Sequence, residues 1–177
     1  MKALFLSLFL AVCFWQGAAA REFTPEEKAD LQAQIVRFET ALKQGDFAVV
    51  AESVPPKVLQ HIASKAGVDM ATLRSAMQAQ MQIALASVKF LDFEMDVDKA
   101  AYKQAPDGTP YVLVPSRSLM ETKGQKIEAK TATLALIDGG KWYLVRIDDA
   151  QQINIVREVY PPLATVAFPT GTMEAVQ

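Results

Sequence analysis

The sequence predicts an α+β domain: N-terminal helices packed on a curved four-stranded antiparallel sheet, followed by a short C-terminal helix and an extended tail. Two observations lead to this fold class. Apolar residues recur every three or four positions as far as residue 87 and every second position after it, so helices come first and strands follow. Residues 131–148 then contain two β-rich runs around Gly139-Gly140, the pattern of a β-hairpin.

The first 20 residues have the features of a secretion signal. Lys2 precedes an apolar run from Ala3 to Trp15, and the small residues Ala18-Ala19-Ala20 form a cleavage site. We therefore expect a signal peptide at 1–20, one α+β domain at 21–160 and an extended tail at 161–177. The mature protein would be periplasmic or secreted.

Cys13 is the only cysteine and lies inside that apolar run. A lipid anchor at Cys13 is the alternative, but the bulky Val12 before it is unlike the small residue found there in lipoprotein signals. We expect no stable membrane anchor after cleavage and no disulfide, so a packed core must stabilise the domain. The net charge of −2, with acidic and basic residues interspersed, gives no footprint for nucleic acid.

The first helix is predicted to start at Thr24, because Thr24, Pro25 and Glu27 together form a capping box with proline at the first helical position. Gly45 ends this helix. Its inward stripe has the spacing of an amphipathic helix and consists of Leu31, Ile35, Phe38 and Leu42.

Three further helices are expected before the strands. Asp46 caps a short helix over 47–54 that Pro55-Pro56 ends. A helix over 57–66 stops at Gly67, and Asp69 caps the longest one, which extends to about residue 87. The inward residues of the 57–66 helix are expected to be Val58, Leu59, Ile62 and Ala66.

The longest helix has a stripe rich in methionine: Met70, Leu73, Met77, Met81 and Ala84. Such a stripe could form an adaptable groove or a copper site. We interpret it as core packing, because cysteine and histidine are scarce.

The strands are predicted at 88–98, 111–120, 126–138 and 141–148. Pro115 indicates a bulge or an edge in the second of them. With a two-residue loop in the final hairpin, Leu136 faces Tyr143 and Leu134 faces Val145, which makes one face of the hairpin apolar. After Asp149 a short helix is expected, which Pro161-Pro162 stops.

This order of elements, with FETALKQGDFAVV as a helix-turn-helix start and GGKWYLVRID as the final hairpin, resembles the nuclear transport factor 2-like, or SnoaL-like, superfamily. The resemblance covers residues 24–149. It implies a cone in which the helices pack on the concave side of the sheet around a ligand pocket in some members, and dimers formed through the sheet in many. Members include isomerases, dehydratases and subunits without chemistry, so the fold alone does not predict activity.

Enzymes of that superfamily generally hold an acid/base dyad, often Asp and His, inside the cone. The only histidine here is His61, which falls on the polar flank of its predicted helix. The sequence also lacks a nucleophile elbow, a phosphate loop and metal-ligand spacing. We therefore predict no catalytic residue, no metal and no cofactor.

Four acidic residues alternate along the first predicted strand: Asp92, Glu94, Asp96 and Asp98. Residues two apart on a strand are roughly 6.5 to 7 Å from each other, whereas calcium needs its oxygens at about 2.3 to 2.6 Å. We expect a solvated face, with Lys126 and Lys130 as cross-strand partners.

The candidate ligand-binding residues are Trp142, Arg146, Arg117 and Tyr111. The guanidinium of Arg146 would bind a carboxylate-bearing or planar ligand. Trp142 would border it, together with Tyr111 or Arg117 from the other long strand. The alternative is a surface ion pair with Asp148 on the outer side of the sheet.

The expected function is that of an exported non-catalytic binding or accessory domain that engages a small apolar ligand or a protein partner. One alternative is a small lyase or isomerase of the SnoaL-like type. Another is a structural envelope protein that forms a homodimer through its sheet. An open cone with one anchoring charge would favour the binding domain, a polar dyad the enzyme, and a closed apolar cone the structural protein.

Overall fold

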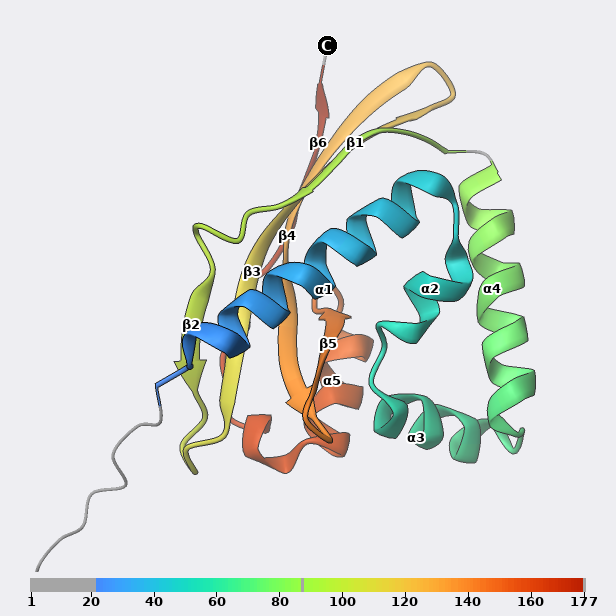
Figure 1. Cartoon of the computed structure of the whole chain (residues 1–177). Coiled ribbons are helices and arrows are strands. Elements are labelled where there is room, and N and C mark those ends of the chain that lie inside the picture. The colour runs from blue at the N-terminus through green and yellow to red at the C-terminus, as the bar shows by residue number, and fades with distance from the viewer. Residues whose placement is uncertain (1–21, 87, 177) are drawn as a thin grey trace, which may run out of the picture.

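The computed structural model describes residues 22–86 and 88–176, so the predicted signal peptide lies outside the described residues. This part of the chain is α+β, with helices arranged around a curled antiparallel sheet (Figure 1). The helices are α1 (Pro25–Gln44), α2 (Phe47–Glu52), α3 (Pro56–Ala66), α4 (Met70–Ala86) and α5 (Ala150–Val159), with a 3-10 turn η1 (Pro161–Leu163). The strands are β1 (Lys89–Met95), β2 (Ala101–Gln104), β3 (Pro110–Thr122), β4 (Gln125–Asp138), β5 (Lys141–Arg146) and β6 (Thr172–Val176). None of these helices has both the length and the apolar character needed to cross a bilayer.

The two long strands β3 and β4 form the centre of the sheet. The strand order is β1-β3-β4-β5, with β2 also paired to β3 and β6 also paired to β4. The four predicted strands correspond to β1, β3, β4 and β5, whereas β2 and β6 were not predicted. Each of the two central strands therefore has two partners in succession along its outer side.

The predicted register of the final hairpin is confirmed. Leu136 pairs with Tyr143 and Leu134 with Val145. Gly139 and Gly140 have φ values of 57° and 77°, the left-handed conformation that a two-residue hairpin turn needs and that glycine adopts without strain.

The helix caps are also confirmed. The Thr24 hydroxyl accepts a bond from the backbone N–H of Glu27, whose carboxylate accepts one from the backbone of Thr24. Asp46 and Asp149 cap α2 and α5 through the backbone N–H groups of Val49 and Gln152. Local hydrogen bonding thus fixes where these helices start.

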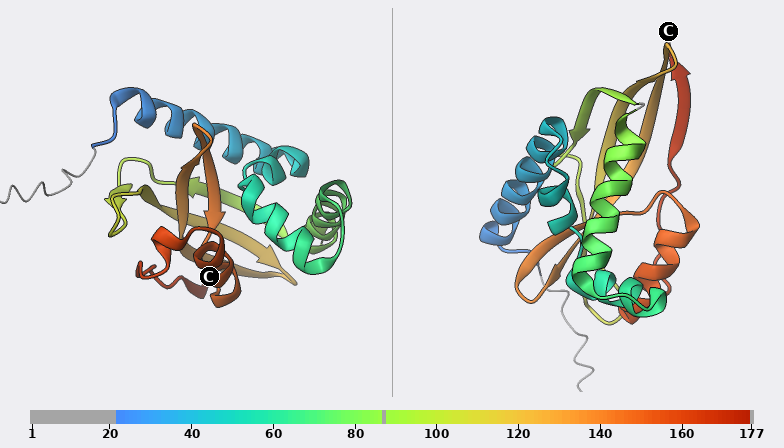
Figure 2. Two further views of the ribbon diagram at one scale, coloured as in Figure 1. Left: turned by 90° about the horizontal axis from the view of Figure 1, so that it is seen from below. Right: turned by 90° about the vertical axis from the view of Figure 1, so that its right-hand side faces the viewer.

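The inner part of the sheet is buried on both faces. α1 covers one face, and α5 with the segment after it covers the other, so the sheet lies between them (Figure 2). We call these the α1 face and the α5 face. The core on the α1 face contains Leu31, Ile35, Met95, Val112, Val114, Ala135, Trp142 and Leu144. The core on the α5 face contains Ala105, Tyr111, Leu113, Ala132, Leu134, Leu136, Ile147, Val156, Leu163 and Val166.

The methionine stripe of α4 is not core packing, contrary to the prediction. Met70, Met77 and Met81 are only half-buried, and no described side chain of α4 is fully buried. The reason is the position of the helix: α4 packs on α2 and α3 at the side of the domain (Figure 1). In α3 the inward residue of the last turn is Ala63, which is 3% exposed, rather than the exposed Ala66.

Pro115 occupies the point where the outer neighbour of β3 changes. Ser116 pairs with Met95 of β1, and Leu113 pairs with Ala101 of β2. The Pro115 carbonyl accepts a bond from Asp96 N–H on this side, so the missing N–H of proline faces away from β4 and breaks no ladder bond. β3 is a central strand, so the predicted edge exists only locally, in the gap between β1 and β2, and the pairing of β3 with β4 continues through Pro115 without a bulge.

The described part of the predicted tail, residues 161–176, packs on the α5 face through Leu163 and Val166 and ends in β6. Arg157 of α5 donates to the Val166 carbonyl at 3.0 Å and lies over the Phe168 ring at 5.7 Å. β6 then pairs antiparallel with residues 126–130 of β4.

Candidate binding surface

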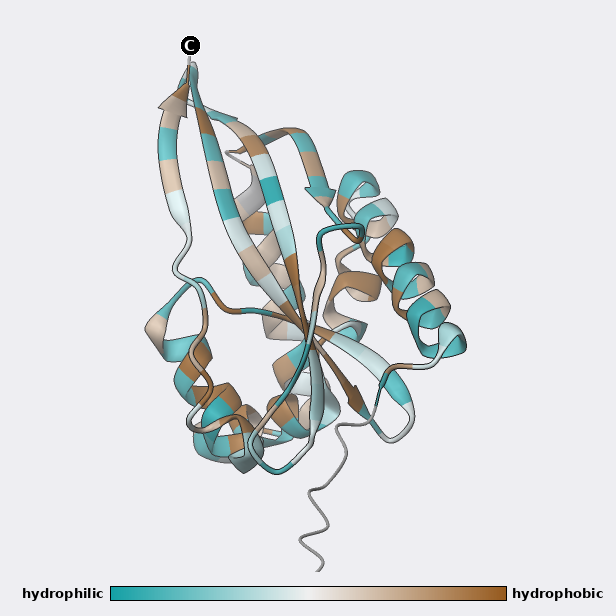
Figure 3. Ribbon diagram, turned by 90° about the vertical axis from the view of Figure 1, so that its left-hand side faces the viewer, coloured by the Kyte–Doolittle hydropathy of each residue, from teal (hydrophilic) through white to brown (hydrophobic). Residues whose placement is uncertain are grey.

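The end of the sheet next to the β3–β4 turn has two different faces. We call it the outer end of the sheet; it consists of β1, β6 and the adjoining parts of β3 (residues 116–122) and β4 (residues 125–131). Apolar and polar residues alternate along these strands (Figure 3). Because successive side chains of a strand point to opposite faces, one face of the outer end is charged and the other is apolar.

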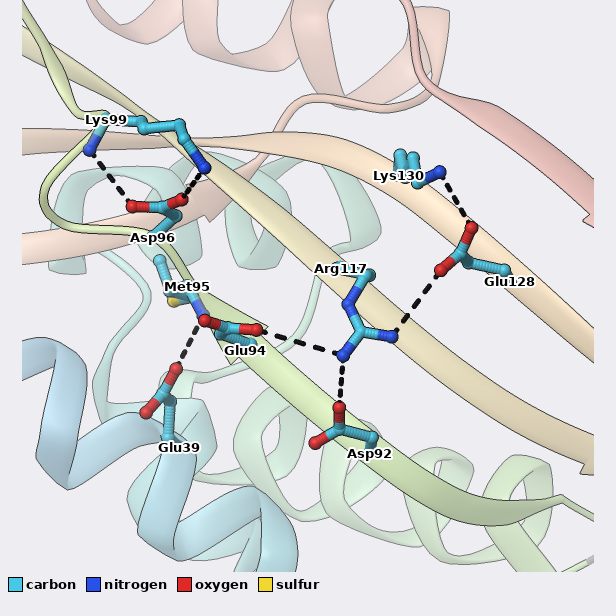
Figure 4. A network of polar contacts seen from close by, with 9 residues as sticks. All are labelled: Glu39, Asp92, Glu94, Met95, Asp96, Lys99, Arg117, Glu128 and Lys130. Atoms are coloured by element: carbon cyan, nitrogen blue, oxygen red, sulfur yellow. Dashed lines mark hydrogen bonds and ion pairs between the residues drawn. The ribbon is translucent and has the colours of Figure 1, made fainter.

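The charged side belongs to the α5 face and is centred on Arg117 of β3 (Figure 4). Its guanidinium forms ion pairs with Asp92 and Glu94 of β1, the latter at 3.8 Å. On the other side it donates to Glu128 of β4 at 3.5 Å, and Lys130 lies 2.8 Å from the same carboxylate. Charges of opposite sign therefore neutralise one another across three strands.

This arrangement corrects one predicted pairing. Lys126 and Lys130 were expected to face the acidic residues of β1, but β1 pairs with β3 and not with β4. Arg117 therefore takes that place. In addition, β1 ends at Met95, so Asp96 instead closes a turn in which it accepts from the backbone and side chain of Lys99.

The ion pairs predict how the stability of the domain depends on pH. The hydrogen bond from Lys130, with a further one from Arg117, lowers the pKa of Glu128. The pKa of Glu128 is lower in the folded state than in the unfolded state, where it is about 4.3. The charged carboxylate therefore stabilises the fold at a pH above the unfolded-state pKa. This stabilisation is lost as the pH falls through the folded-state pKa. In thermal melts between about pH 5 and 3, Glu128→Gln should lose less melting temperature than the wild type. Equal losses in both proteins would contradict this role of Glu128.

The apolar side of the outer end belongs to the α1 face. The strand register places Met120 of β3 beside Ile127 of β4, and these two lie between Phe90 and Ala175. The next row consists of Phe93, Ser118, Ala129 and Met173. Phe90, Met120 and Ile127 are half-buried, whereas Met173 is 68% exposed. We call these eight residues the apolar rows.

The helix α4 precedes β1, the first strand of the apolar rows. Its C-terminal end leads through Val88 into β1, and an open depression of about 420 Å³ lies between this junction and the β3–β4 turn at Lys123 and Gly124. In its 17 residues α4 has a single charged side chain, Arg74, and it exposes Ile83 to 69%. A helix on the surface of a soluble domain normally has charged or polar residues on its outer side. In α4 these are Thr72, Ser75, Gln80 and Gln82, and the exposed Ile83 is a large apolar side chain among them.

Trp142 and Arg146 of the predicted site lie on the α1 face. Trp142 is 7% exposed, donates its indole N–H to the Glu27 carbonyl at 2.8 Å and stacks on Phe23. It is therefore part of the core beneath α1. Arg146 is largely exposed and forms an ion pair with Asp148, as in the alternative that the sequence left open.

Tyr111 and Arg117 lie on the opposite face. Tyr111 is 5% exposed within the α5-side core, and the carboxylates described above surround Arg117. The residue that neighbours Arg146 across the sheet, beyond Thr133, is Val114. The structure therefore does not bring the four predicted residues together around one ligand.

His61 belongs to a polar seam between α3 and α5. Its ring lies 2.9 Å from Glu158, and Lys65 lies 2.5 Å from the same carboxylate. Further along the seam the Tyr160 hydroxyl donates to Asp138 at 3.0 Å, and burial together with this carboxylate raises the pKa of Tyr160. These contacts attach α3 to α5 at the surface.

Among the residues that the structure describes, no group of three or more His, Cys, Asp or Glu side chains could hold a metal ion. Comparison of the chain with protein-family models, curated proteins and solved structures gives no match.

Proposed function

We propose that this protein is an exported, non-catalytic binding domain that uses the apolar rows and α4 to bind a protein partner. The observation that supports it most directly is the contrast between the two faces of the outer end. The face with Arg117 is charged and suited to water. On the opposite face α1 reaches Phe93 through Phe38, whereas Phe90, Met120 and Ile127 are half-buried and lie outside the described core beneath α1. Exposed apolar patches bordered by polar residues are typical of interaction sites.

A protein partner fits this surface better than a small apolar ligand. Small-molecule sites are usually concave pockets that enclose most of the ligand, whereas α1 fills the space over Trp142 on the inner part of the sheet. The apolar rows instead span β1, β3, β4 and β6 as an extended surface. Half-buried methionines in the rows and in α4 give such a surface side chains that adapt to a partner.

Two further proposals come from the sequence. We propose that the chain is a distant member of the nuclear transport factor 2-like superfamily, with the helices on the concave side of a cone. We also propose that residues 1–20 direct export and are removed. The α+β fold, the helices before the strands and the GGKWYLVRID hairpin support the first proposal, and the apolar run with its small-residue cleavage site supports the second.

Photo-crosslinking of the full-length protein in the cells that produce it tests the binding surface. A benzophenone amino acid at position 120 should yield a discrete adduct with another protein, because this position is in the apolar rows. The matched control is position 121, which is equally half-buried and lies on the charged face. We expect an adduct at least several-fold stronger from position 120, and Ile127→Gln should weaken it.

The outcomes separate the alternatives. Equal adducts from positions 120 and 121, or no adduct from either, would contradict the proposal. An adduct that contains only lipid or a small molecule would overturn the choice of a protein partner. A circular-dichroism spectrum and melting temperature close to those of the wild type must accompany each variant, since Ile127 is only half-buried and its replacement should leave the fold intact.

A further inference from the structure

The outer edge of β6 differs from the β1 and β5 edges of the sheet. At the β1 edge a register shift between Phe90 and Asp92 interrupts the strand, and Glu39 of α1 accepts from the Met95 N–H at 2.6 Å. At the β5 edge the Leu144 N–H donates to the Ser53 carbonyl at 2.8 Å. Proteins commonly protect edge strands by bulges, charges and covering groups of this kind.

Within the described part of the chain, β6 has β4 as its only neighbouring strand. It contains one charged residue, Glu174, and no proline or bulge. Its residues from Thr172 to Ala175 are exposed, and Met173 is exposed to 68%. β6 is therefore an open edge whose backbone can pair with one more strand. The partner that fits such an edge is another extended strand.

We propose that β6 pairs antiparallel with β6 of a second copy of the chain, about a twofold axis through Met173. The proposal concerns the edge of the sheet and does not depend on the partner of the apolar rows. A second copy of the chain is the simplest partner, because in a twofold dimer the same strand forms both sides of the contact.

The register follows from the faces of the sheet. A twofold axis perpendicular to the sheet keeps each face on its own side, so a residue of β6 must lie opposite one on the same face. Thr172, Glu174 and Val176 belong to the α5 face, and Met173 and Ala175 to the α1 face. One residue of β6 must therefore lie directly opposite the same residue of the second copy, and we name the axis by that residue.

Charge and apolar contact select the residue on the axis. An axis through Glu174 would place two carboxylates directly opposite each other, which is destabilising. An axis through Met173 places Glu174 opposite Thr172 of the second copy and brings the two exposed methionine side chains together. An axis through Ala175 would join two methyl groups and leave Met173 without that apolar contact.

The Met173 register also continues the apolar surface. The row that contains Phe93, Ser118 and Ala129 ends at Met173 on the edge of the sheet. In the dimer this row continues into the same row of the second copy. The contact remains small compared with the roughly 800 Å² per partner of a standard interface, so we expect a weak dimer that forms at high concentration.

Disulfide trapping tests the proposal on the full chain. In a Cys13→Ser background, which removes the only cysteine of the sequence, Met173→Cys should give a disulfide-linked dimer under mild oxidation. Two controls are Glu174→Cys, the next residue of the same strand, and Val36→Cys, an exposed position on α1 that is 54% accessible. We expect at least tenfold more linked dimer from Met173→Cys than from either control.

Each result decides one part of the proposal. A higher yield from Glu174→Cys than from Met173→Cys would overturn the register, and equal yields from all three would mean random collision. Sedimentation of the Cys13→Ser protein from roughly 10 µM to 1 mM should show a rising mass, and Met173→Lys should abolish that rise by placing two ammonium groups on the axis. A constant monomer mass together with no trapped dimer would overturn the proposal and leave the edge to a strand of another protein.

Discussion

Leu134→Asp is expected to abolish folding. Leu134 is fully buried in the core on the α5 face, where β4 meets Val156 of α5 and Ile147 after β5. An unpaired carboxylate at this place costs several kcal/mol or drives protonation of the group, and the apolar burial of the leucine, about 1.5 to 3 kcal/mol, is lost as well. Together these losses compare with the whole margin of a domain, about 5 to 15 kcal/mol. Circular dichroism and thermal melts should show no cooperative transition.

Two further variants on the same sheet give stability losses with which that of Leu134→Asp can be compared. Glu94→Ser removes an exposed carboxylate 3.8 Å from Arg117, and we expect a change within about 0.5 kcal/mol. Val145→Asp should fall between the two, because Val145 pairs with Leu134 but is partly exposed. Similar melts for all three variants would contradict the assignment of the buried face.

Local signals in the sequence were enough for the elements whose ends depend on nearby residues. Asp46 and Thr24 cap their helices through residues three positions away, and Gly139-Gly140 sets a hairpin whose strands are adjacent in sequence. Such contacts do not depend on the rest of the fold. The predicted start of α1 and the register of the final hairpin are accurate for this reason.

Elements that depend on distant partners were not predictable in the same way. The stripe on α4 indicates that the helix has an apolar side, but not that α4 would lie on α2 and α3 instead of the sheet. β2 and β6 span 4 and 5 residues, which is too short for alternation to stand out. The position of each comes from pairing with β3 or β4, a long-range contact.

One turn that is visible in the sequence determines which residues of β3 and β4 share a face of the sheet. Lys123 and Gly124 form a two-residue turn with φ values of 51° and 76°, so that Thr122 pairs with Gln125. This register puts Tyr111 beside Leu136 and on the opposite face from Trp142. It also puts Met120 beside Ile127. If Lys123 and Gly124 are taken as a two-residue turn, the sequence alone indicates that these two apolar residues are neighbours.

Trp142→Ala is expected to lower the free energy of unfolding by about 3 to 5 kcal/mol, the usual cost of removing a buried large aromatic side chain. The indole packs with Leu31 and Ile35 of α1 on the sheet and stacks on Phe23 at 5.8 Å between ring centroids. Its loss should leave the protein folded but loosen the start of α1. Chemical denaturation measures the first effect, and hydrogen exchange of residues 25–35 measures the second.

Trp142→Phe separates packing from the hydrogen bond to the Glu27 carbonyl. Phenylalanine keeps most of the apolar contact but has no N–H donor. The Glu27 carbonyl lies inside α1 and remains an acceptor within the helix, so it is not left without a partner. The cost should therefore be about 0.5 to 1.5 kcal/mol, the net value of one hydrogen bond, in addition to a small packing loss. If Trp142→Ala cost no more than Trp142→Phe, the indole would not be the contact that holds α1 on the sheet.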